Sequence, residues 1–195
     1  ITLPECGQEY AFQKRVDRSG GGELCEFELA VRAEGKPKGF EVCCSLPELG
    51  GVEVVLVPSR YSKLSGIWNG LMERHHYLGS GPLCGSQLRY LVRANSQSSS
   101  EAHGWLGGLS FSGATWRLQA REKWIGWSES ARRAHLQEVV CNSRFLLLPT
   151  VQVPHLASHV LGSCLRRLPG DWEERYGYAP ALVETFVDPG RFRGT

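Results

Sequence analysis

The chain has 195 residues, of which 42% are hydrophobic, which is enough for one sizeable core, or for one domain with a small appendage. The formal net charge of +2 and the pI near 8.2 do not indicate the strongly basic surface of a typical nucleic-acid-binding protein. A local basic patch stays open, because arginines occur in pairs at Arg132 and Arg133 and at Arg166 and Arg167.

No stretch reaches the roughly 18 apolar residues that a membrane-spanning helix needs. The first residues, "ITLPECGQEY", lack the basic and then apolar layout of a secretory signal. We therefore expect a soluble protein of the cytoplasm with no membrane segment. Because the chain begins at Ile1 and its only methionine is Met72, we also expect it to be a fragment of a longer protein.

The cysteine pattern favours buried thiols. There are seven cysteines, none in a C-x-x-C pair, and Cys43 and Cys44 are adjacent in a strand-like segment. We expect neither a disulfide nor a structural zinc site, since the compartment is expected to be reducing.

The N-terminal part is rich in β patterns. "LCEFELAVRA" alternates, "EGKPKG" has the composition of a turn, and "GFEVCC" and "VEVVLV" follow as β-rich runs. We expect a hairpin and one further strand over 24–57, and we assign residues 1–58 to a β-rich N-terminal segment. Residues 59–195 form the second unit, a core expected to be truncated at its C-terminus.

In this core the spacing predicts an amphipathic helix over 62–76, followed by a glycine-containing loop. Strands are expected at 87–93 and 105–112, and the paired glycines of "WLGGLSFS" invite a close backbone approach. A helix fits 113–123. A second helix, "SESARRAHLQEVV", would have Leu136, Val139 and Val140 on its apolar side.

The last part predicts a strand, a helix and a strand. The strand at 144–149 is nearly continuously apolar, so we expect it to be central, with Phe145 and Leu147 buried. A helix at 155–168 ends before Pro169 and Gly170, a short helix covers "DWEERYG", and a strand follows at 181–187. The fold class is α/β (α+β), a mixed sheet with flanking helices.

The start of the 155–168 helix is a candidate anion site. Backbone N–H groups after Pro154 have no partner within a helix, and the helix dipole favours a negative charge there. Alternatively, Pro154 serves conformation alone, His155 faces solvent and His159 makes an ordinary hydrogen bond. These two histidines have the four-residue spacing of metal ligands, but no third ligand is evident, so we predict no metal site.

Three further positions are candidates for acid–base chemistry or stacking. His76 follows His75 at a helix end beside a glycine turn, where an imidazole can serve as a base. Glu184 lies within an apolar strand, so it faces a cleft or pairs with an arginine. Arg121, Trp124 and Trp127 in "REKWIGWS" offer flat surfaces for stacking, or they cover a sheet edge.

Several long stretches resemble the DruA family of the Druantia anti-phage system, whose relatives also occur joined to transposase modules. These stretches are "WNGLMERHHYLG", "GSQLRYLV", "LGGLSFSGATWRLQAREKWIGWS", "NSRFLLLPTVQVPHLASHVLG" and "DWEERYGYAPALVETFVDPGRFRGT". The resemblance covers residues 68–195 and implies a role in anti-phage defence or mobile-element DNA metabolism. It also implies further residues beyond "RFRGT". Asn142 and Arg144, which open the fourth stretch, are expected to bind substrate together with the arginine and tryptophans of "REKWIGWS".

The order of strand, helix start, helix and strand also resembles the core of the GNAT acyltransferases, which hold the coenzyme A pyrophosphate at such a helix start. Their loop, Arg/Gln-x-x-Gly-x-Gly/Ala, compares with "QVPHLAS", which keeps a glutamine and small residues but lacks both glycines. The resemblance implies acetyl-CoA or another acyl-CoA as cofactor, held by Gln152, His155, Ala157 and Ser158. His76 and Glu184 would then be catalytic.

Two hypotheses of different classes follow. The first is a GNAT-like transferase. The second is a non-catalytic module that binds nucleic acid or a partner protein through the same arginines and aromatic residues. Expected partners are DNA, other proteins of the defence system or transposase proteins, with no membrane.

Overall fold

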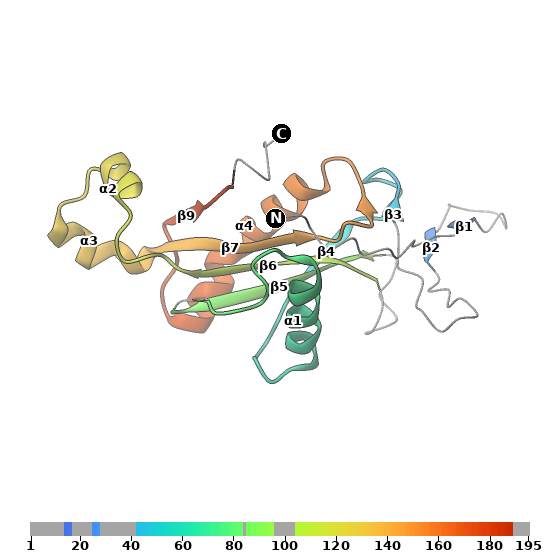
Figure 1. The fold of residues 1–195 in the computed structure, drawn as a ribbon, viewed down its shortest axis with the longest axis horizontal. Coiled ribbons are helices and arrows are strands. Elements are labelled where there is room, and N and C mark those ends of the chain that lie inside the picture. The colour runs from blue at the N-terminus through green and yellow to red at the C-terminus, as the bar shows by residue number, and fades with distance from the viewer. Residues whose placement is uncertain (1–13, 17–24, 28–41, 84, 96–103, 189–195) are drawn as a thin grey trace.

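The structure is a computed structural model that describes residues 14–16, 25–27, 42–83, 85–95 and 104–188. Its centre is a five-stranded sheet in the order β4-β5-β6-β7-β9 (Figure 1). The strands are β4 (Val52–Leu56), β5 (Gln87–Ala94), β6 (Trp105–Gly113), β7 (Val139–Leu147) and β9 (Leu182–Thr185). The first four are antiparallel neighbours, and β9 is parallel to β7. The predicted mixed sheet and α+β class are confirmed.

Helix α4 (Leu156–Tyr176) covers one face of the sheet. A buried side chain recurs at every fourth position, and this spacing keeps the buried side chains on one side of a helix. These side chains are Leu156, Val160, Cys164, Leu168 and Trp172. They form one apolar core with strand residues that include Tyr90, Phe111 and Val140. We call this side of the sheet the α4 face.

The prediction that this helix ends before Pro169 is wrong, as is the separate short helix over "DWEERYG". One helix continues through Pro169 and stops at Gly177, which takes a positive φ of 80°. A proline inside a helix costs about 3 kcal/mol. Burial of the whole Trp172 side chain contributes a comparable amount. The apolar stripe therefore extends the helix past the proline.

Helix α1 (Lys63–His75) packs on the opposite face, which we call the α1 face, and confirms the helix predicted over 62–76. Trp68 and Met72 are fully buried there. The predicted close backbone approach occurs at Gly108, where an added Cβ would lie 3.0 Å from the Tyr90 carbonyl oxygen. The same Cβ would lie 3.1 Å from Trp68 Cδ1 and 3.2 Å from Met72 Cε, so this glycine also makes room for α1. The indole of Trp68 donates a hydrogen bond to the Leu109 carbonyl at 3.0 Å.

Two short helices, α2 (Gln119–Ile125) and α3 (Glu129–His135), and a 3-10 turn at Leu136–Glu138 connect β6 to β7. The helix predicted over 113–123 therefore begins later, at Gln119. Val139 and Val140, predicted to be helical, are the first residues of β7 and are 2% and 0% exposed. Two consecutive β-branched residues favour a strand between neighbours, and here β6 and β9 are those neighbours.

The strand predicted at 144–149 is the second half of β7. It is interior in the strand order, as expected, but Phe145 and Leu147 are half-buried rather than buried. The reason is that β9 pairs only with Val139 to Asn142. Beyond this point β7 has a paired strand on one side only within the described residues.

The N-terminal segment contributes to three pairings. β1 (Lys14–Val16) and β2 (Cys25–Phe27) are antiparallel, and β3 (Val42–Cys43) runs parallel to β8 (Val151–Gln152), just before α4. β4, which the sequence analysis placed in this segment, is the edge strand of the five-stranded sheet. The expected turn "EGKPKG" lies outside the described residues.

Candidate functional site

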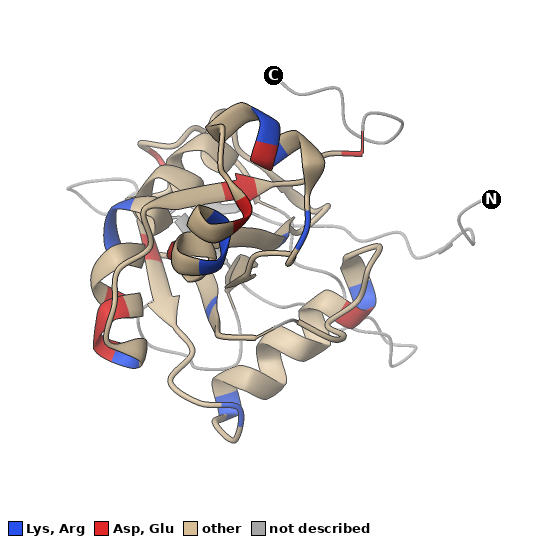
Figure 2. Ribbon diagram, turned by 90° about the vertical axis from the view of Figure 1, so that its left-hand side faces the viewer, with Lys and Arg blue, Asp and Glu red and all other residues tan. Residues whose placement is uncertain are grey.

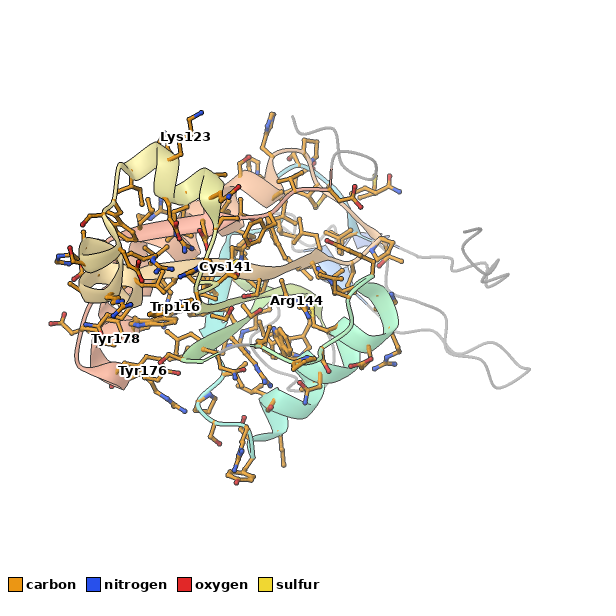
Figure 3. All side chains as sticks on the ribbon, turned by 60° about the vertical axis from the view of Figure 1, so that its left-hand side comes forward. Trp116, Lys123, Cys141, Arg144, Tyr176 and Tyr178 are labelled. Atoms are coloured by element: carbon orange, nitrogen blue, oxygen red, sulfur yellow. The ribbon has the colours of Figure 1, made fainter. Side chains whose placement is uncertain are left out.

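A band of polar side chains crosses the α1 face beside α1. Residues that pair directly across neighbouring strands project to the same face of a sheet, and the register brings Gln87, Ser112, Cys141 and Glu184 into one row. In Figure 3, Cys141 and Arg144 lie along β7. We call the set the polar band: Gln87 and Arg89 on β5, Ser110 and Ser112 on β6, Cys141, Ser143 and Arg144 on β7, and Glu184 on β9.

A bulge in β7 shapes the centre of this band. The register shifts between Ser110 and Phe111, so that Ser143 is an extra residue in β7. Asn142 fixes the bulge, because its amide donates to the Ser110 carbonyl at 3.1 Å and to the Arg144 carbonyl at 3.2 Å. The Ser143 hydroxyl contacts the Ser112 hydroxyl. The bulge therefore places two consecutive residues, Ser143 and Arg144, on the α1 face.

Arg144 ties β7 to the loop after α1. The residue is 9% exposed, and its guanidinium donates to the carbonyls of Gly79 at 2.8 Å, Gly81 at 2.7 Å and Ser143 at 2.7 Å. All three acceptors are neutral. Arg144 therefore brings a positive charge into the polar band and orders the loop beside it.

His76 lies in the same loop, at the C-terminal cap of α1. Burial, and secondarily the Arg144 charge, lower the pKa of its imidazole. Its Nδ1 accepts a hydrogen bond from the Leu78 N–H at 3.2 Å, which assigns the proton of the neutral ring to Nε2. To accept a proton at Nε2, the imidazole must first move its own proton to Nδ1 and release the Leu78 N–H.

Glu184 pairs with Arg121, one of the two alternatives left open by the sequence. Both carboxylate oxygens accept from Arg121 Nη1, at 3.0 and 3.1 Å, and the two side chains are 11% and 3% exposed. Arg121 Nη2 donates to the Thr115 carbonyl at 2.7 Å, whereas its Nε is buried without a hydrogen-bond partner. The carboxylate is therefore compensated, and the Nε–H of the guanidinium has no acceptor.

Cys141 lies opposite Glu184 in the β7–β9 pairing. Burial and the Glu184 charge raise the pKa of its thiol to about 11, against the lowering effects of Ser143, Arg144 and Arg121. The thiol is therefore protonated at neutral pH and is not an activated nucleophile. Opposite Arg144 on β6, the Ser110 hydroxyl is fully buried and has no hydrogen-bond partner. The band thus offers neutral donors and positive charge.

The residues predicted to hold a cofactor lie at the start of α4. Gln152, His155, Ala157 and Ser158 are all exposed. His155 takes a positive φ of 62° and caps the helix without a side-chain hydrogen bond, and the first turn has no acidic residue. A cavity of about 600 Å³ is lined by Cys43 to Ser45, at the end of β3, and by Val151 to Pro154, in and after β8.

The structure does not bring all predicted residues together. Arg121 joins Glu184, and Asn142 joins Arg144, but Trp124 is 78% exposed on α2 and Trp127 is half-buried. Trp116, which the sequence analysis did not select, lies under the Arg132 guanidinium at 4.9 Å and is labelled in Figure 3. No group of three His, Cys, Asp or Glu residues in the described part of the chain is arranged to hold a metal ion.

The polar band also includes residues that the sequence analysis missed, namely Gln87 and Arg89 of β5, the serines of β6, and Cys141 and Ser143 of β7. The available signal was polar residues at alternate positions of otherwise apolar strands, as in "GLSFSG". Such alternation marks one polar face of a sheet. It does not reveal which strands combine to form the face.

The family of the protein follows from a comparison with protein-family models. The model described as "Druantia protein DruA" matches residues 44–194, which include β4 to β9 and the whole polar band. The chain belongs to the DruA family. This membership indicates a role in anti-phage defence together with other defence proteins. No curated protein and no solved structure matches the chain.

The DruA-family match also covers α1 and α4, the longest helices described. None of the helices in the described residues is both long and apolar enough to span a membrane.

Proposed function

We propose that this DruA-family chain acts in anti-phage defence as a GNAT-like transferase, with the start of α4 holding an acyl-CoA and the polar band facing the acceptor. The observation that carries the proposal is the β7–α4–β9 unit. It is the only parallel pair of the five-stranded sheet, and its two strands are paired only as far as Asn142 and Thr185. Beyond that point the described β7 is open on the side of β9. Ligands of α/β folds bind where strands separate in this way at their carboxyl ends.

The residues at the start of α4 fit a pyrophosphate in two respects. Ala157 and Ser158 are small and exposed, and the free N–H groups of the first turn meet no acidic side chain. Gln152 and His155 would contribute donors from the preceding segment. When bound, an acyl-CoA would supply a thioester whose carbonyl carbon is attacked by an amine or hydroxyl, with the coenzyme A thiol as leaving group.

The chain's own residues would orient the acceptor and manage its proton. The Arg144 charge suits a negatively charged acceptor, and the exposed ring of Trp124 suits a flat one. His76 is the candidate base because its lowered pKa keeps the ring neutral at pH 7. Glu184, compensated by Arg121, would act as a positioning residue.

The test is coenzyme binding by the full chain, measured by calorimetry with coenzyme A and acetyl-CoA. Ser158→Asp places a negative charge at the start of α4 and should weaken binding about fivefold or more, since a charge at a helix terminus contributes about 1 kcal/mol. Ser163→Asp, the matched control, puts the same charge later in α4 and should change affinity less than about twofold. Absence of binding to the wild-type chain, or equal affinity in the two variants, would overturn the assignment.

A second readout is protection against phage, measured as plating efficiency on cells that carry the complete defence system. Ser158→Asp should reduce protection while Ser163→Asp should not, provided that both proteins melt at the wild-type temperature. Full protection by Ser158→Asp would instead favour the second hypothesis, a module that binds nucleic acid or protein without catalysis.

A further inference from the structure

A second cavity, of about 600 Å³, lies at the other end of α4 from the proposed donor site. It is enclosed by the end of β4, the start of α1, the start of β5 and the end of α4. Three arginines line it, Arg60, Arg89 and Arg175, and no described Asp or Glu does. Because a helix of 21 residues is about 30 Å long, the cavity is remote from the start of α4. We call it the arginine pocket.

The charges in the arginine pocket are not neutralised by carboxylates in the described part of the chain. Elsewhere, positive and negative residues are interspersed along the helices (Figure 2). Six arginines form ion pairs, namely Arg93, Arg117, Arg121, Arg132, Arg133 and Arg167. The three arginines of the pocket contact only neutral acceptors. An anion in this cavity would therefore meet uncompensated positive charge.

The guanidinium groups are held in place by these neutral contacts. Arg89 lies over the Trp68 ring at 4.8 Å and donates to Gln87 Oε1 at 2.8 Å and to Asn69 Oδ1 at 3.1 Å. Arg175 Nη1 donates to the Pro58 carbonyl at 2.7 Å. Burial lowers the pKa of Arg89, the effect expected of a charge with no anion beside it. A pre-positioned guanidinium loses little entropy when it binds a phosphate.

An aromatic ring stands at the edge of the same cavity. Tyr61 is 82% exposed, and the Arg60 guanidinium lies over its ring at 4.7 Å. An exposed ring beside arginines is the usual surface on which a nucleobase stacks. A phosphate without a base would make no use of this ring.

We propose that the arginine pocket binds a nucleotide, with its phosphate groups on Arg60, Arg89 and Arg175 and its base on Tyr61. The nucleotide is either free or part of a single strand of nucleic acid, since both present the same phosphate and base. This site is separate from the proposed acyl-CoA site at the start of α4, although it shares Gln87 and Arg89 with the polar band.

The test measures binding to the full chain with three probes: inorganic pyrophosphate, AMP and a 12-nucleotide oligo-dT. The variant Arg60→Gln/Arg175→Gln removes two exposed charges of the pocket. It should lower the affinity for each probe that the wild type binds by about tenfold or more, because two guanidinium groups no longer donate charge-assisted hydrogen bonds to the phosphate. The matched control is Arg166→Gln, on an exposed residue of α4 outside the pocket that also forms no ion pair. The affinity of this variant for each probe should stay within about twofold of the wild-type affinity.

Tyr61→Ala separates the base from the phosphate. It should weaken AMP and oligo-dT several-fold and leave pyrophosphate unchanged. Tighter binding of oligo-dT than of AMP, with a salt dependence that falls in the double variant, identifies a nucleic-acid strand. Tighter binding of AMP identifies a free nucleotide.

Three results would overturn the proposal: no binding of any probe by the wild type, equal losses in the double variant and Arg166→Gln, or an equal loss of all probes in Tyr61→Ala. Ser158→Asp should bind the oligonucleotide like the wild type, because it alters only the far end of α4. A loss there would mean that the oligonucleotide occupies the start of α4 instead.

Discussion

The two faces of the central sheet are built on different principles. On the α4 face, one long helix covers the strands with a stripe of apolar side chains. On the α1 face, Trp68 and Met72 pack against Gly108, but the neighbouring strand positions carry serine, arginine and glutamate. The α4 face thus provides the stability of the fold. The α1 face holds buried polar groups, some without a partner, as binding sites do.

The largest expected effect lies on the α4 face. Trp172→Ala should lower the free energy of unfolding by about 3 to 5 kcal/mol, because a fully buried indole leaves a cavity. Trp124→Ala, at a ring that is 78% exposed, should change it by less than about 0.5 kcal/mol. Guanidinium denaturation measures the free energy of unfolding of both variants. Similar losses in the two would contradict the conclusion that the α4 face provides the stability of the fold.

The next effect concerns the buried ion pair of the α1 face. Glu184→Gln should cost about 3 kcal/mol, because it leaves the Arg121 charge without compensation at 3% exposure. The double variant Arg121→Met/Glu184→Leu should recover at least half of that loss, since it removes both charges. The same denaturation experiment decides, and a single variant as stable as wild type would show that water screens the pair.

Arg144→Ala should have a smaller and more local effect. It leaves the Gly79 and Gly81 carbonyls without their donor and should cost about 2 kcal/mol. Hydrogen exchange should accelerate at residues 77–81 and remain slow in α4. Arg74→Ala is the control, because this exposed arginine donates only to Gly70 within its own helix. Unchanged exchange in the loop would show that other contacts order it.

The smallest effect compares one cysteine from each face. Burial raises the pKa of Cys164 to about 12 on the α4 face, and that of Cys141 to about 11 among the polar residues of the α1 face. Thiolate absorbance against pH should therefore lose its transition near 11 in Cys141→Ser, and the later one in Cys164→Ser. A Cys141 transition near the ordinary value of 9.0 would mean that solvent reaches the band.

The raised pKa values of these thiols also determine how the free energy of unfolding changes with pH. A thiol with a raised pKa in the folded chain stays protonated while the unfolded chain loses its proton. The stability that this thiol contributes is complete below pH 9 and declines as the pH rises toward 11 for Cys141. The midpoint temperature of thermal unfolding should therefore fall less steeply over this pH range in Cys141→Ser than in the wild type.

Sequence patterns predicted the elements whose burial is periodic. The α1 helix, strands β5 and β6, and the parallel β7–α4–β9 unit were expected because their apolar residues repeat at helical or strand spacing. The passage of α4 through Pro169 was missed, since a local rule for proline gave way to the burial of Trp172. The start of β7 was misplaced, because Val139 and Val140 fit an apolar helix side as well as a strand.

The candidate site was less accessible to prediction because its contacts join distant positions. Arg121 and Glu184 are 63 residues apart, and only the pairing of β9 with β7 brings them together. The sequence indicated an arginine partner as one alternative for Glu184 but did not identify it. The pocket formed by Arg60, Arg89 and Arg175 had no signal in a near-neutral composition, because its charge is local.

The extra residue at Ser143 sets the parity of β7. Val140 and Phe145 both contribute to the α4 face although an odd number of positions separates them, and only the bulge makes this possible. If all nine residues of β7 alternated strictly from Val140, the Arg144 guanidinium would lie on the apolar α4 face and Phe145 on the α1 face. The bulge absorbs the odd residue, so both halves of the strand keep their faces. Deletion of Ser143 would therefore leave the side chains on either side of it in phase, whereas one further inserted residue would invert one half of β7 unless a second change compensates it.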